Sequence, residues 1–185
     1  MDGPLLPEDA NIPMRTYRQT GYSLMNLSLT LLLAALVAAG ILAFASMLDT
    51  RRKVNETLDL AHRAAARTKE LGANQADGYA TLTTAQLADL VPVNQRTLSG
   101  GNIDSLRTAL NRPLRLVPNG NFAFWIRLSN LSSSECRALI RQAWLHYPRV
   151  QLNAVVRKTS STATLVTADL DACAATNNTL DMEGS

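Results

Sequence analysis

The sequence predicts an α+β protein in which a long N-terminal helix packs on a mainly antiparallel sheet with one further helix. Three observations predict this fold. No charged residue falls between Tyr22 and Leu48, an apolar stripe at helical spacing follows, and apolar residues alternate in short runs after residue 113. With 185 residues, the chain has room for one membrane helix and one modest globular domain.

The first element is the uncharged segment 22–48. Between Leu31 and Leu48, only Gly40 and Ser46 interrupt a run of Leu, Ala, Val, Ile, Phe and Met. A helix rises about 1.5 Å per residue, so about 20 such residues cross a bilayer core. We therefore expect this segment to span a membrane, because a domain of this size rarely buries so long an uncharged helix on all sides.

The second element, residues 49–72, is expected to continue the same helix with one apolar side. Arg52 with Glu56 and Asp59 with Arg63 are spaced to form ion pairs on the solvated side, and Gly72 is expected to end the helix. The whole helix would be about 70 Å long. Its apolar stripe consists of Val54, Leu58, Ala61, Ala65, Thr68 and Leu71.

Residues 73–112 are expected to form the loop region between the helix and the sheet. Within it, Thr83 and Thr84 precede a short capped helix over 85–91 that ends near Pro92. Residues 99–102 are predicted as a loop, and residues 103–110 as another helical turn or two. Nothing in this region indicates catalytic chemistry.

The sheet is expected to begin with a hairpin of strands 114–117 and 121–128, in which Phe122, Phe124, Ile126 and Leu128 share one face. Ser132 and Glu135 then form a capping box. The helix that follows places one set of residues on its buried face and ends before Pro148. These residues are Cys136, Leu139, Ile140, Ala143 and Trp144.

Two more strands are predicted after this helix, and then a loose tail. Val150, Leu152, Ala154 and Val156 alternate as one strand, and residues 162–170 form the next. The sheet and helix region therefore covers 113–173. The polar residues 174–185 are expected to be loose.

The two cysteines, Cys136 and Cys173, have no CxxC or metal-ligand spacing. If they pair, they close a loop of about 37 residues and stabilise the domain by about 4 kcal/mol. Such a bond persists in an oxidising compartment such as the periplasm. The alternative is two buried free thiols.

No set of residues indicates an enzyme or a cofactor site. The two histidines, His62 and His146, have no sequence partner for a triad or a metal site, so both are predicted to be surface residues, and the chain has no phosphate-binding loop. Without residues 1–21, the chain has 16 basic and 12 acidic residues and a net charge of +4. No basic cluster is interleaved with aromatics, so no specific nucleic-acid partner is expected.

The N-terminal flank carries a resemblance to a known family. Twenty polar or mixed residues, with Arg15 and Arg18, lead to Gly21 before the apolar run, and cleavage there would leave the hydrophobic helix at the new N-terminus. This arrangement resembles the type IV pilins, whose prepilin peptidase cuts after such a glycine and methylates the new amino group. The resemblance makes 1–21 a leader and Tyr22 the methylated first residue.

The length of the leader, the first residue and the order of elements are similar to the type IVb branch, which includes thin-pilus pilins of conjugative systems and bundle-forming or toxin-coregulated-type pilins. The resemblance implies that Cys136 and Cys173 form a disulfide. It also implies a structural subunit, with itself, the prepilin peptidase and the inner-membrane assembly machinery as partners. The precursor would lie in the inner membrane and the assembled pilus outside the cell, for attachment or conjugative contact.

One position departs from the family, and one observation favours another class of protein. The family carries a Glu at the fifth mature position, where this chain has Asn26, an amide that can form a hydrogen bond but cannot supply a charge pair. A minor pilin or secretion pseudopilin is therefore an alternative. Arg51, Arg52 and Lys53 directly after the apolar run favour a cytoplasmic C-terminal side. The third possibility is an uncleaved single-pass membrane protein with a binding domain.

Overall fold

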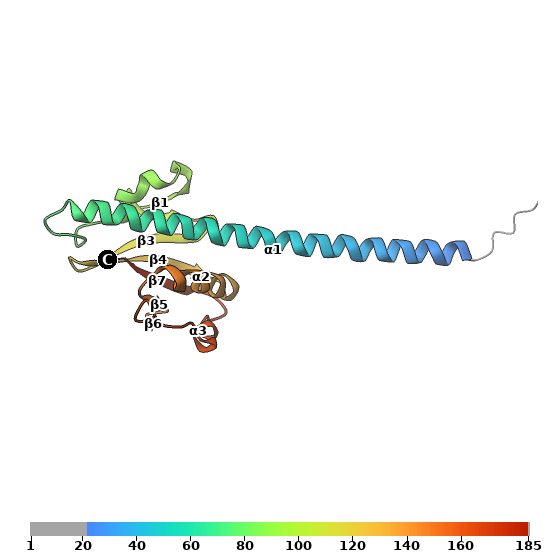
Figure 1. The fold of residues 1–185 in the computed structure, drawn as a ribbon. Helices are drawn as coiled ribbons and strands as arrows, with labels where there is room; N and C mark the ends of the chain where they lie inside the picture. Colours follow the sequence, from blue (N-terminus) through green and yellow to red (C-terminus); the bar gives the residue numbers. More distant parts are fainter. Residues whose placement is uncertain (1–21, 185) are drawn as a thin grey trace, which may run out of the picture. The chain divides into compact units, whose positions relative to one another are not determined.

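The computed structural model describes residues 22–184, and the side chains of these residues except those of 22–24 and 46. The chain divides into two compact units, Met1–Ala45 and Ser46–Ser185. The elements (Figure 1) are α1 (Tyr22–Ala73), η1 (Thr84–Leu90), η2 (Val93–Gln95), β1 (Arg96–Ser99), β2 (Asn102–Arg107), β3 (Pro113–Asn119), β4 (Ala123–Leu131), α2 (Ser133–His146), β5 (Val150–Leu152), β6 (Val155–Lys158), α3 (Thr167–Asp171) and β7 (Asn178–Gly184).

The described part of the second unit forms a seven-stranded sheet in the order β1-β2-β3-β4-β7-β5-β6. All its strand pairs are antiparallel. The last strand, β7, lies between β4 and β5, so that Met182 faces Ile126 on one side and Val150 on the other. Residues Asn178–Gly184 therefore form an interior strand that joins β4 to β5.

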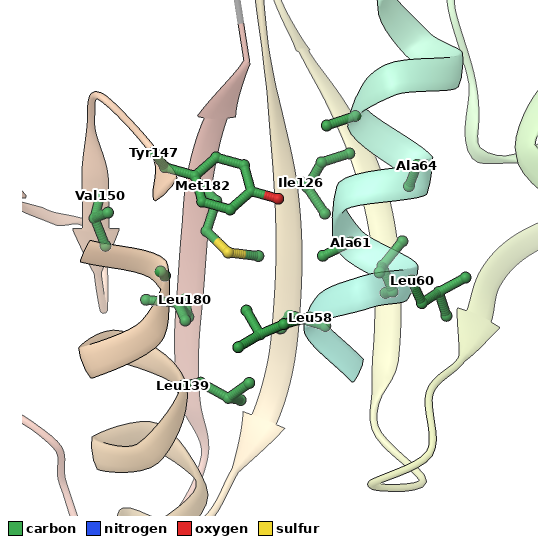
Figure 2. Packing of buried hydrophobic residues seen from close by; sticks show 14 of the residues in the cluster. Leu58, Leu60, Ala61, Ala64, Ile126, Leu139, Tyr147, Val150, Leu180 and Met182 are labelled. Atoms are coloured by element: carbon green, nitrogen blue, oxygen red, sulfur yellow. The ribbon is translucent and has the colours of Figure 1, made fainter. Parts of the chain in front are cut away.

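Figure 2 shows α1 around Ala61 and Ala64 and α2 around Leu139 packed on the same face of this sheet. Ala61 and Ala64 of α1 and Leu139 of α2 are fully buried against Ile126 and Leu180 of the sheet. The alanines bring the α1 backbone close to the strands, while the larger side chains of α2 and the sheet fill the rest of the core. The core thus lies between two helices and one sheet face.

The predicted course of α1 is confirmed. Its apolar stripe is buried from Val54 to Thr68 and half-buried at Leu71, and the helix ends at Ala73. The ring of Tyr79 lies where a side chain at Gly72 would be, because an added Cβ would approach it to 2.2 Å. The ion pair between Arg52 and Glu56 also forms, as does that between Asp59 and Arg63.

The predicted capping box at the start of α2 is confirmed. The Ser132 N–H donates to Glu135 Oε2 over 2.7 Å, and the Glu135 N–H donates to Ser132 Oγ over 3.4 Å. Together these bonds satisfy amides that have no partner within the helix. The buried residues of α2 are the five expected from its period, and Tyr147 and Pro148 follow its end.

The predicted loop 73–112 is wrong in its second half. The predicted short helix before Pro92 does form, at Thr84–Leu90, but as a 3₁₀ helix. Residues 103–110 are not helical, because Asn102–Arg107 pairs with Arg96–Ser99 as a hairpin. Gly100 and Gly101 make its turn possible, since their φ angles of +58° and +82° strain any side chain other than glycine.

The hairpin of β3 and β4 is confirmed, with Leu114 opposite Leu128. The placement of Phe122 on its buried face is wrong. Phe122 lies in the turn before β4 begins and is 89% exposed, whereas Phe124, Ile126 and Leu128 are fully buried.

Three predictions for the C-terminal third are wrong. The run from Val150 to Val156 is two strands, since Asn153 and Ala154, with φ angles of 51° and 64°, turn the chain between β5 and β6. Residues 162–170 form no strand. Trp144 Nε1 holds this segment by donating to Ala163 O over 2.7 Å, and α3 follows with the Val166 N–H bound to Asp169.

The third wrong prediction is the loose tail 174–185. Residues Asn178–Gly184 form β7, an interior strand of the sheet between β4 and β5. Leu180 and Met182 face the core, while Asp181 and Glu183 point to the other face, where arginines neutralise them. The sheet and helix region therefore extends from β1 to β7, beyond the predicted 113–173.

Candidate assembly helix and head surface

The described residues of the first unit form an exposed apolar helix, which is the candidate assembly surface. Within the described part of the chain, one helix is long and apolar enough to cross a membrane, with a mean hydropathy of 2.5 in its most apolar window. None of that window is buried by the chain itself. Such a surface is stable in lipid or against other apolar helices, but not in water. Its large apolar residues up to 45 are Met25, Leu27, Leu29, Leu31, Leu32, Leu33, Leu36, Val37, Ile41, Leu42 and Phe44.

The hydroxyl groups of Ser28 and Thr30 in this helix are satisfied by the helix backbone. Ser28 Oγ donates to Met25 O over 2.9 Å, and Thr30 Oγ1 donates to Leu27 O and Asn26 O over 2.9 and 3.0 Å. A hydroxyl that donates to a carbonyl one turn back needs no water. These residues therefore do not prevent the helix from entering an apolar environment.

The residues expected at the processing site are only partly described. Gly21 lies outside the described residues. Tyr22 is the first residue of α1, and Asn26 lies one helical turn later with an exposed side chain. An exposed amide at this position can reach a partner helix, which makes Asn26 a candidate contact between subunits.

A disulfide links Cys136, in the first turn of α2, to Cys173, which follows α3. Their Cα atoms are 5.9 Å apart, and both residues are buried. The neighbouring Ser133 Oγ donates to Cys173 O over 3.3 Å. The bond therefore fastens the segment between α3 and β7 to the start of α2, and the alternative of two free thiols is excluded.

His62 and His146, which the sequence predicts as unpartnered surface residues, lie against each other. Their ring centroids are 5.0 Å apart, and His62 also stacks on Tyr147 at 5.1 Å. Burial, and next the nearby charge of His146, lower the pKa of His62, while Asp59 opposes this shift. Burial also raises the pKa of the Tyr147 hydroxyl. No sequence spacing could have indicated this contact, because 84 positions separate the histidines.

A half-buried charged network surrounds Glu135. The carboxylate accepts from Arg112 Nε over 3.1 Å as well as from Ser132. Burial opposes ionisation, but the bonds from Ser132 and the Arg112 guanidinium outweigh it and lower the pKa of Glu135. This network fastens the start of α2 to the segment before β3. Among the described residues, no group of three or more His, Cys, Asp or Glu side chains could hold a metal ion.

These features, a long apolar helix followed by an α+β head with a disulfide near its C-terminal end, define the class of fold. No protein-family model matches the sequence, and no curated protein matches it. Among solved structures, it is similar to a type IV b pilin from Salmonella typhi, with a TM-score of 0.52 at 15% identity over 72% of this chain and 99% of that chain. The chain therefore has the fold of a type IVb pilin.

A second solved structure is more distantly similar. It is TcpA, a type IV pilin from Vibrio cholerae El Tor, with a TM-score of 0.46 at 13% identity. The match covers 74% of this chain and 99% of that chain.

Proposed function

We propose that the chain is a structural subunit of a type IVb-like pilus. Cleavage after Gly21 by a prepilin peptidase leaves Tyr22 as the N-terminal residue, which is then methylated. The subunit waits in the inner membrane with its head on the periplasmic side, and the assembly machinery polymerises it into an extracellular filament. The filament serves attachment or conjugative contact.

The observation that carries this proposal is that a chain with a pilin fold also has an apolar helix whose surface is not buried by the rest of the chain. The fold matches that of a pilin over 99% of the pilin's length. The helix window is 0% buried, so it needs either lipid or equivalent helices around it. Lipid satisfies it in the stored state, and neighbouring subunits satisfy it in the filament.

N-terminal sequencing and intact mass of the protein from its native host test the proposal. We expect a chain that starts at Tyr22 and whose mass exceeds that of the unmodified cleaved chain by one methyl group. The matched control replaces Gly21 with a bulky residue, which should leave residues 1–21 in place. A native chain that keeps residues 1–21 in cells with active prepilin peptidase contradicts the proposal.

Two other functions each have one observation in their favour. Asn26 favours a minor pilin or a secretion pseudopilin, and the abundance of the chain in sheared filaments separates these from a major subunit. Arg51, Arg52 and Lys53 favour an uncleaved single-pass membrane protein with a binding domain. That protein would retain residues 1–21.

A further inference from the structure

A hollow of about 310 Å³ lies between the start of the amphipathic part of α1 and the middle of α2. Two arginines, Arg51 of α1 and Arg141 of α2, line it together with the neutral side chains of Asn55 and Gln142. Both arginines are exposed. The hollow therefore presents two cations to the surroundings and has no acidic residue in its lining.

The neighbouring cations are neutralised, but these two are not. Arg52 pairs with Glu56 at 2.7 Å, Lys53 pairs with Asp49, and Arg137 pairs with Asp171 at 3.5 Å. Within residues 22–184, neither Arg51 nor Arg141 has a carboxylate oxygen within 4.0 Å. Among residues 22–184, the two arginines are therefore left free to bind an anion from outside this part of the chain.

The position of the hollow along α1 indicates which anion it meets. Arg51 follows the last residue of the apolar run, Leu48, by three positions, a rise of about 4.5 Å. If the apolar run occupies the hydrocarbon core, Arg51 lies at the level of the lipid phosphates. Arginine binds phosphate through paired N–H groups, and basic residues at this depth attract anionic lipids.

We propose that Arg51 and Arg141 together bind the phosphate of an anionic phospholipid headgroup in this hollow. The inference rests on the proposed membrane-stored state of the subunit. The lining contains no carboxylate to bind the ammonium group of a zwitterionic lipid, and this favours phosphatidylglycerol over phosphatidylcholine. Because Arg141 belongs to α2, the bound lipid holds the head against the membrane surface until the subunit leaves the bilayer.

The test uses the full-length chain in nanodiscs that contain equal amounts of phosphatidylglycerol and phosphatidylcholine. Native mass spectrometry counts the lipids that each chain retains on release. We expect wild type to retain phosphatidylglycerol preferentially, Arg51→Gln and Arg141→Gln to lose about fivefold of that preference each, and the double variant to lose more. Equal preference in wild type and the double variant overturns the proposal.

Arg137→Gln is the matched control, because it removes the same charge one turn earlier on α2, from a residue that already has a partner. Its lipid preference should equal that of wild type. If this variant loses as much preference for phosphatidylglycerol as Arg51→Gln and Arg141→Gln, overall charge explains the effect and the assigned site is overturned. An excess of inorganic phosphate should not displace the lipid; displacement overturns a lipid-specific site. A chain that does not insert into the nanodiscs contradicts the proposed function itself. A chain that inserts but shows no lipid preference contradicts only the proposed site.

Discussion

Arg127 on β4 and Asp181 on β7 lie directly opposite each other, and their side chains form a two-point ion pair. Arg127 Nε donates to Asp181 Oδ1 over 2.7 Å, and Nη2 donates to Oδ2 over 3.0 Å. The aspartate side chain is only 2% exposed, whereas the arginine keeps 39% exposure. The pair therefore neutralises a buried carboxylate at the join between the last strand and the rest of the sheet.

Arg127→Met should lower the free energy of unfolding by about 1–3 kcal/mol, because it leaves the buried Asp181 carboxylate without its hydrogen-bond donors. Arg127→Met combined with Asp181→Asn should cost less than Arg127→Met alone, since the double variant no longer buries an unpaired charge. Urea unfolding of the full-length chain in detergent measures both. A double variant that is as unstable as Arg127→Met alone, or less stable, would contradict this explanation.

Lys158 at the end of β6 caps the C-terminus of α2. Its ammonium group donates to the carbonyl oxygens of Trp144 and Tyr147, and the side chain is buried. The last carbonyls of a helix have no partner within the helix, and a cation there also interacts favourably with the helix dipole.

Lys158→Met should therefore destabilise the head by about 1–3 kcal/mol. Lys69→Met, at an exposed position on α1, is the control and should change little; equal losses in the two variants would exclude a capping role.

The disulfide between Cys136 and Cys173 should contribute about 4 kcal/mol, because it closes a long loop in the unfolded chain. We expect the variant with both cysteines replaced by serine to unfold at lower temperature than wild type. Reduction of wild type should have a similar effect, and the reductant should not affect the serine variant. Unchanged thermal unfolding after reduction would show that the bond adds no stability.

The sequence was sufficient to predict the parts of the fold whose signals are local. The uncharged run, the stripe from Val54 to Thr68 and the capping box of Ser132 and Glu135 each depend on residues within one or two helical turns. The exposed position of Asn26 and the apolar surface around it follow from the same local pattern. These features define the candidate assembly helix almost completely.

The strand β7 could not be predicted from the sequence because its identity depends on distant partners. Asp181 and Glu183 give the segment the composition of a solvated tail, and only Arg127 and Arg149, distant in sequence, make their burial favourable. The contact between His62 and His146 is likewise set by the packing of α2 on α1. Long-range pairing overrides local composition at both places.

Acid should destabilise the head through His62. Because burial and the neighbouring His146 lower its pKa in the folded chain, the unfolded chain, with a histidine pKa near 6.5, binds a proton first as the pH falls. The free energy of unfolding should therefore decrease as the pH falls below about 6.5, and this contribution should level off below the folded pKa. Thermal unfolding between pH 8 and pH 5 measures it.

The groups that face His62 come from three elements. They are Asp59 and Lys69 on α1, His146 and Tyr147 at the end of α2, and Glu183 on β7. His62→Gln should flatten the pH dependence, and His146→Gln should reduce it, since the second histidine supplies part of the pKa shift. If His62→Gln keeps the wild-type slope, other groups are responsible for the acid sensitivity.

Two leucines with similar exposure distinguish the assembly helix from ordinary surface. Leu36 in the apolar run is 62% exposed, and Leu145 near the end of α2 is 76% exposed. In water, replacing either with arginine should change little. In a bilayer, an arginine at the centre of the helix costs about 2.5–3.5 kcal/mol by insertion scales. Leu36→Arg should therefore reduce membrane retention and remove the chain from sheared filaments.

Leu145→Arg should leave both membrane retention and filament yield near wild type. Fractionation of host cells, followed by immunoblotting of membranes and sheared filaments, measures the two variants side by side. Loss of filaments in both variants would indicate a general folding defect, and normal filaments in Leu36→Arg would contradict an apolar filament core. Because both side chains are exposed in the isolated chain, we expect a difference between the two variants to come from the lipid or from the neighbouring subunits that the proposed function places around α1.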